Sequence, residues 1–241
     1  MMNNTANREV CDCVFLDYKT KKPALYVNYA NTTTQEMTGN TVYAYGGKGH
    51  PRRIAFQGEK EGTITIETQL RSFQLYSFLT GAAIEKTAKF IKREVLDVGA
   101  DGAVTLSASA LSGTAFFFAD DDDCGTALTA TGTGTAYSIT DAAEGDRVIA
   151  YYWVEKSSGV QTLNIKSTTF PGTFIFQGDT YDKAEDGSIV PYLYIAHKCA
   201  PQPTFSLSQA NTGDPASLTI TCDLLADEND DMLTMTEILE A

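Results

Sequence analysis

Polar and apolar residues alternate strictly in the stretch TITIE, residues Thr63–Glu67. Successive side chains of an extended strand point to opposite faces, so Ile64 and Ile66 lie together on one face of such a strand and the polar residues on the other. The stretch SLTITCDL, residues Ser217–Leu224, has the same alternation. A sheet of such strands buries one face in a core and leaves the other face polar. The sequence therefore predicts amphipathic β-strands at Thr63–Thr68 and Leu218–Leu224.

Other short runs of alternation, bounded by Gly, Pro, Asn or Asp, predict further strands along the chain. They are Val42–Tyr45, Ile54–Phe56, Val104–Ala108, Val148–Val154, Phe174–Phe176, Tyr192–Ala196 and Thr204–Ser208. The chain is therefore predicted to be mainly β.

One α-helix is predicted between Ser72 and Gly81. The Ser72 hydroxyl can cap the first turn, apolar residues follow at helical spacing, and Gly81 can take the left-handed conformation that ends a helix. The apolar residues cover more than one stripe, so we expect this helix to flank the sheet. The stretch Glu85–Arg93 is predicted to extend the helix or to form a second short one.

Composition excludes several classes of function. The chain has 241 residues, 43% of them hydrophobic, with 18 Lys and Arg against 31 Asp and Glu, a net charge of -13. Tight binding to nucleic-acid phosphates needs clustered cations, so it is disfavoured. Apolar runs such as Ala115–Ala119 are far shorter than the roughly 20 residues of a membrane-spanning helix. The polar start Met1–Thr5 has no apolar segment after it, so we expect no signal peptide and synthesis in the cytoplasm.

Residues 94–156 differ in composition from the rest of the chain. Asp97–Gly102 is turn-like, and Thr126–Ser138 is rich in Thr, Gly and Ala with few charges. This pattern fits a small β-rich insertion at 94–156 within a discontinuous β domain of residues 1–93 and 157–241, although a run of edge hairpins would look the same.

Metal and disulfide sites are not expected. The five cysteines, Cys11, Cys13, Cys124, Cys199 and Cys222, form no C-x-x-C pair, so we interpret them as reduced. His197 and Cys199 are two residues apart and could share an ion, but ordinary packing explains the spacing as well. The run Asp120–Asp123 does not match an EF-hand loop. A solvated hairpin tip accounts for it better, and calcium binding through another loop geometry stays open. No cofactor is predicted.

The basic loop Gly46–Arg53 is not a phosphate-binding loop, because Pro51 and then a strand follow its lysine where a helix would be needed. We interpret it as a connector whose Lys48, Arg52 and Arg53 contact an acidic surface, such as that of another copy of the chain. No serine lies in Gly-x-Ser-x-Gly and neither histidine belongs to a metalloprotease pattern, so the chain is predicted not to be an enzyme.

The segment TTFPGTFIFQGDTY, residues Thr168–Tyr181, resembles the tail-tube-type proteins of long-tailed bacteriophages, particularly contractile-tailed phages of Gram-positive hosts. The later segment Phe205–Ile220 is similar to the closing hairpin of that family. Further similar segments occur in the family's order, namely Gly46–Gly49, Ile54–Phe56, Gly58–Ile66 and the helix end Leu79–Ala82. Together the segments cover roughly residues 40–95 and 165–225, while residues 94–156 depart from the simplest family pattern.

The resemblance implies a β-sandwich or barrel with one flanking helix, whose subunits form hexameric rings stacked into a tube around a channel for DNA. It implies a virion structural protein whose partners are copies of itself, the tail sheath, the baseplate and terminator proteins, with DNA passing only transiently. Seven polar residues are then candidates for the lumen face, where negative charge keeps DNA from adhering: Thr63, Thr65, Glu67, Ser217, Thr219, Thr221 and Asp223. The reverse assignment of inner and outer sheets stays open.

Two other classes of function stay open. One is a β-sandwich module of a capsid decoration, baseplate or carbohydrate-binding protein, which clustered exposed aromatic residues would favour. Tyr151, Tyr152 and Trp153 are candidates, but consecutive strand residues point to alternate faces, so at least one of them is expected to be buried. The other is the tube of a contractile injection machine.

Overall fold

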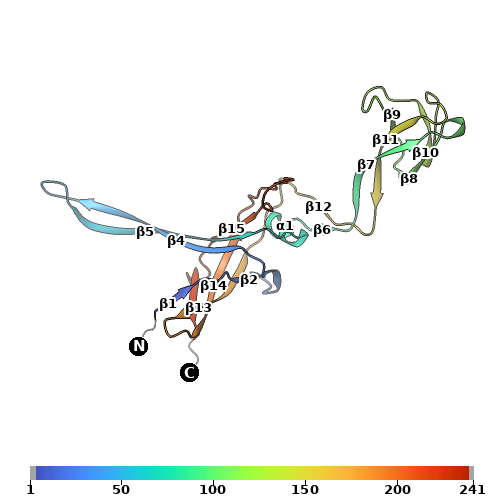
Figure 1. Ribbon diagram of the computed structural model, residues 1–241. Coiled ribbons are helices and arrows are strands. Elements are labelled where there is room, and N and C mark those ends of the chain that lie inside the picture. The colour runs from blue at the N-terminus through green and yellow to red at the C-terminus, as the bar shows by residue number, and fades with distance from the viewer. Residues whose placement is uncertain (1–3, 239–241) are drawn as a thin grey trace. The chain divides into compact units, whose positions relative to one another are not determined.

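The computed structural model describes residues 4–238, which form two compact units (Figure 1). The first unit combines residues 4–83 with 163–238, and the second comprises residues 84–162. The prediction of a mainly β chain is confirmed. Within residues 4–238, no helix has the length and apolar character needed to cross a membrane. The expectation about a signal peptide falls in part on residues 1–3, which lie outside the described residues.

A nine-stranded antiparallel sheet forms the first unit. Its strands follow the order β3-β2-β13-β14-β15-β5-β4, with β1 added beside β13 and β16 beside β14. Their bounds are β1 (Thr5–Asn7), β2 (Asp12–Asp17), β3 (Pro23–Val27), β4 (Thr32–Tyr45), β5 (Arg52–Thr68), β13 (Phe174–Ala184), β14 (Ile189–Pro201), β15 (Leu218–Leu224) and β16 (Leu233–Glu237).

The core of the first unit lies between this sheet and helix α1 (Phe73–Thr80). The ring of Phe78 lies 4.7 Å from that of Phe15 and 4.5 Å from that of Phe174, measured between ring centroids. Both predicted helix ends are confirmed. The Ser72 hydroxyl accepts from the backbone N–H of the third helical residue at 3.1 Å, and Gly81 ends the helix at a φ of 70°.

Two strand predictions in the first unit need correction. Ile54–Phe56 and Thr63–Thr68 are not separate strands but parts of the continuous strand β5, because β4 pairs with it along nearly its whole length. Gly62 forms no turn and lies within the strand, where the Met37 and Leu224 side chains lie so close that a larger residue would displace them.

The predicted strand Thr204–Ser208 is wrong, and the first strand of the expected closing hairpin is absent from the described residues. The segment is a loop. Its conformation is fixed from outside: the Arg71 guanidinium donates to the carbonyl of Ser208 at 3.2 Å and to that of Ala216 at 2.7 Å. The ring of Phe205 lies 6.2 Å from that of Tyr76. The hydrogen bonds from Arg71 and the contact between Phe205 and Tyr76 hold this loop, in place of backbone pairing with another strand.

The second unit is a small β assembly with a core of its own. A three-stranded antiparallel sheet has the order β7-β11-β9, and a two-stranded sheet pairs β10 with β8. Tyr152, Phe117, Leu106 and Ile139 are all buried between the strands. The strands are β7 (Ala88–Asp97), β8 (Ala103–Ala110), β9 (Phe116–Ala119), β10 (Ala130–Ile139) and β11 (Arg147–Lys156), with the short 3₁₀ turn η1 (Ala100–Gly102) before β8.

The prediction of helix over Glu85–Arg93 is wrong. Glu85 belongs instead to strand β6 (Ile84–Glu85), which pairs with β12 (Thr162–Leu163), and Ala88–Arg93 belongs to β7. Every residue of β7 pairs with one of β11, so pairing with a neighbouring strand decides the conformation over local helix propensity.

Candidate functional site

The seven candidate lumen residues meet on one face of the first unit's sheet. Strands β5 and β15 are neighbours, and the register places Thr63 opposite Asp223, Thr65 opposite Thr221 and Glu67 opposite Thr219. Ser217 is exposed directly before β15. Residues 64 and 66 of β5 and 220 and 222 of β15 point the other way and are fully buried. The sheet therefore has one core face and one polar face here.

Strand β4 adds three residues to this surface that sequence reasoning missed. Thr32, Thr34 and Glu36 lie opposite Glu67, Thr65 and Thr63 of β5. The strand gave no signal because its inward residues are polar as well. One of them, Thr33, accepts a hydrogen bond from the backbone N–H of Cys11. Because both faces are polar, the stretch TTTQE shows no alternation of apolar and polar residues. We call the nine strand residues the polar face: Thr32, Thr34, Glu36, Thr63, Thr65, Glu67, Thr219, Thr221 and Asp223.

The polar face is anionic. Three of its nine residues are carboxylates, six are threonines, and none is Lys or Arg. Asp223 accepts a hydrogen bond from the Gln202 side-chain amide at 2.7 Å. Residues 203–206 of the following loop, with Ser217, Thr219 and Thr221, line a hollow of about 510 Å³ beside β15. Such a surface holds water and repels polyanions, because it offers hydroxyl groups and negative charge without cations.

A long hairpin carries the three predicted contact residues. Strands β4 and β5 form a paired ribbon that extends beyond the other strands of the first unit (Figure 1). No residue from position 40 to 57 is buried, and we call this segment the arm. Lys48 lies in its terminal turn, where two glycines with φ near +85° permit the tight reversal. The Arg52 guanidinium lies 4.2 Å from the centroid of the Tyr43 ring, and Arg53 Nε donates to the Gly46 carbonyl at 3.3 Å.

The arm also exposes a row of apolar side chains. Val42 lies opposite Phe56 and Ala44 opposite Ile54, so all four share one face of the hairpin. Val42, Ile54 and Phe56 are each more than 55% exposed. Contiguous exposed apolar surface of this kind marks contact sites in soluble proteins. The sequence pattern predicted the two strands, but it could not indicate that this face of the hairpin stays exposed to solvent.

The cysteines and histidines form no metal centre in the described part of the chain. No group of three or more His, Cys, Asp or Glu side chains in residues 4–238 is placed to hold an ion. His197 Nε2 lies 2.7 Å from Thr234 Oγ1. All five thiols are free and only that of Cys124 is exposed. A hydrogen bond with Cys199 and burial raise the pKa of Cys222, so this thiol stays protonated.

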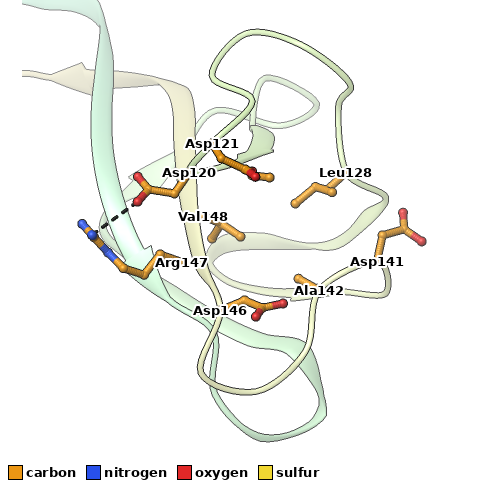
Figure 2. Close-up of a pocket in the computed structure, with 9 residues that line it drawn as sticks. Asp120, Asp121, Leu128, Asp141, Ala142, Asp146, Arg147 and Val148 are labelled. Atoms are coloured by element: carbon orange, nitrogen blue, oxygen red, sulfur yellow. Dashed lines mark ion pairs between the residues drawn. The ribbon is translucent and has the colours of Figure 1, made fainter.

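The acidic run of the second unit is an exposed turn after β9. Asp120 pairs with Arg147 at 3.3 Å, and Asp123 pairs with Arg93 at 2.9 Å. Asp122 accepts from the backbone N–H of Thr126 at 2.8 Å. A hollow of about 380 Å³ lies beside this turn (Figure 2), and its lining includes Asp120, Asp121, Asp141, Asp146 and one cation, Arg147. Of the carboxylates that line the hollow, those of Asp120, Asp141 and Asp146 have separate partners, namely Arg147, the Thr129 N–H and the Ala143 N–H.

Comparison with known proteins gives one family. The sequence matches the family model described as the YomU/Tube protein family over residues 7–238, nearly the whole chain. The match spans both units. No curated protein matches the sequence significantly.

Proposed function

The chain belongs to the YomU/Tube protein family, and from this membership we propose that it is a structural subunit of a bacteriophage tail tube. Copies of the subunit assemble into hexameric rings, and the rings stack around the channel through which DNA leaves the virion. The protein is made in the host cytoplasm and resides in the phage tail. It performs no catalysis; its activity is assembly.

The polar face is the observation that carries this proposal. Its strands bury Ile64, Ile66 and Ile220 on one side and present threonines and carboxylates on the other. When sheets of several subunits join into a barrel, such a face suits a water-filled channel. Duplex DNA carries about one negative charge per 1.7 Å of its axis. Glu36, Glu67 and Asp223 repel these charges, so DNA passes without binding.

The arm supports the proposal from a second direction. It exposes apolar residues and three cations on a chain with a net charge of -13. A second copy of the chain offers the opposite charge, so Lys48, Arg52 and Arg53 are suited to contacts between subunits. Joining of sheet edges between copies also covers unpaired backbone groups that otherwise favour aggregation.

The tail position sets the remaining partners. We propose that the tube contacts a tail sheath, and that it meets a baseplate protein and a terminator protein at its ends. A contractile tail and a Gram-positive host are part of the proposal.

Negative-stain electron microscopy of the purified protein over a range of concentrations and salt tests the proposal. We expect rings with six subunits, or hollow tubes of stacked rings. Analytical ultracentrifugation under the same conditions gives the mass of the particles. A protein that stays monomeric at every salt and concentration contradicts the assignment.

A further inference from the structure

The second unit carries an exposed aromatic surface that its own core does not use. Tyr152 of β11 is buried, whereas Tyr151 and Trp153 point to the opposite side of the sheet, as strand alternation requires. Trp153 lies opposite Ile91 of β7, and Tyr151 lies opposite Phe116 of β9. Ile91, Phe116 and Trp153 are 55%, 54% and 41% exposed. We call this surface the aromatic face: Ile91, Arg93, Val95, Phe116, Phe118, Tyr151 and Trp153.

Negative charge borders one end of the aromatic face. Strand β9 runs from Phe116 and Phe118 directly into the run Asp120–Asp123, and β11 begins at Arg147 next to Asp146. The hollow in Figure 2 lies at this end and is lined by four carboxylates against one guanidinium. The whole second unit has twelve Asp and Glu against six Lys and Arg. We call Asp120–Asp123 and Asp146 the acidic rim.

Along the arm of the first unit, an apolar stretch is followed by charged residues, as on the aromatic face, but here the charges are positive. Its apolar row, which begins at Val42 and Phe56, is followed towards the tip by Lys48, Arg52 and Arg53. The arm contains no Asp or Glu between residues 40 and 57. An arm laid along the aromatic face therefore sets apolar side chains against apolar side chains and cations against the acidic rim.

The dimensions of the two surfaces agree. Four strand residues from Val42 to Tyr45 span about 10 Å, and the five from Ile91 to Val95 span about 13 Å, at about 3.3 Å per residue. Three strands are about 10 Å wide between the outer strand axes, and a two-stranded arm is narrower than this.

We propose that the arm of one copy docks on the aromatic face of the second unit of a neighbouring copy. The proposal rests on the proposed function, because it requires copies of the chain to assemble. Burial of the apolar row stabilises the contact, and the paired charges fix its direction along the face. The second unit thus acts as a receptor that locks adjacent subunits of the tube.

A natural thiol allows a direct test. Cys124 follows the acidic rim and is exposed, while the other four cysteines are buried. Lys48→Cys places a second thiol at the arm tip. After mild oxidation of the assembled variant, we expect disulfide-linked multimers on a non-reducing gel. The double variant Lys48→Cys/Cys124→Ser loses them, and Lys60→Cys, on β5 outside the arm, serves as the matched control that forms none.

Each other outcome overturns the inference in a distinguishable way. Rings or tubes without cross-links place the arm elsewhere and leave the proposed function intact. Multimers that persist after Cys124→Ser show that arm tips meet one another. Failure of the unmodified protein to assemble under any condition removes the proposed function and the inference together.

Trp153 supplies a second readout, because it is the only tryptophan of the chain. Docking covers its ring, so we expect the acrylamide quenching constant to fall by about twofold on assembly, as water is excluded from the contact. An unchanged constant contradicts docking. A saturable change in the fluorescence of unassembled protein with chitohexaose would assign the aromatic face to a glycan instead.

Discussion

Replacement of Glu94 by Gln is expected to destabilise the second unit selectively. Glu94 Oε1 accepts from the Tyr152 hydroxyl at 2.7 Å and from the Ser107 N–H at 2.9 Å. Its Oε2 accepts from the Ser107 hydroxyl at 2.5 Å and lies 3.3 Å from Lys92 Nζ. The side chain is 15% exposed. A glutamine removes the charge and one of the two acceptor atoms, so some of these donors lose their partner.

The pKa of Glu94 sets the magnitude. Burial opposes ionisation, but hydrogen bonds from Ser107, Tyr152 and Lys92 outweigh it and lower the pKa from 4.5 to about 2. One pKa unit corresponds to about 1.4 kcal/mol, and the shift therefore to at most about 3.5 kcal/mol. Solvent screening near the surface reduces this contribution to about 1–2 kcal/mol. Since the folded pKa is depressed, the stabilisation is present above pH 4.5 and is lost as the pH falls towards 2.

The assay is urea unfolding followed by tryptophan emission. Trp153 is the only tryptophan and lies on β11, so its signal reports on the second unit. We expect Glu94→Gln to lower the unfolding free energy at pH 7 by about 1–2 kcal/mol and to flatten its decline between pH 4.5 and 2. Glu155→Gln is the matched control, because its ion pair with Lys89 is about half exposed and is worth less than about 0.5 kcal/mol. Equal effects of the two substitutions refute the reasoning.

Three further perturbations test other parts of the molecule. Gly81→Ala places a Cβ 2.3 Å from the Phe170 carbonyl, at a φ of 70° that favours glycine. We expect the free energy of unfolding, measured by chemical unfolding followed by circular dichroism, to fall by about 2–4 kcal/mol. A fall below about 0.5 kcal/mol contradicts the assigned helix end. Glu67→Lys with Asp223→Lys leaves assembly largely intact in electron micrographs but impairs DNA ejection, so normal infectivity of phage carrying both substitutions argues against a lumen position. Phe56→Asp, on the exposed arm, leaves the melting temperature unchanged but raises the concentration needed for assembly by about tenfold or more; unchanged assembly shows that the apolar row makes no contact between subunits.

Sequence reasoning succeeded where one strand face is apolar and the other polar. Strand β15 has the predicted bounds Leu218–Leu224, and both ends of α1 follow from Ser72 and Gly81. In each case a local signal, alternation or capping, agrees with the burial that the fold provides.

The failures occurred where long-range contacts decide the conformation. Thr204–Ser208 alternates as a strand does, but the bonds from Arg71 to the loop carbonyls hold it as a loop. Thr32–Glu36 has no apolar alternation, yet pairing with β5 makes it part of the polar face. For the arm, the sequence showed apolar alternation but did not indicate that the apolar row is exposed. Exposure depends on how far a hairpin extends beyond its sheet, and local sequence does not carry this information.

The uneven distribution of charge is itself an argument for assembly. Copies of a chain with a net charge of -13 repel one another on average, and this repulsion keeps the subunits soluble. An attractive contact then needs a segment of opposite sign, and the arm, with Lys48, Arg52 and Arg53 and no acidic residue, is such a segment. A two-stranded hairpin that buries neither face is only marginally stable alone. In the proposed contact a second copy covers the apolar row of the arm, so the residues that are unfavourable to expose then favour the assembled state.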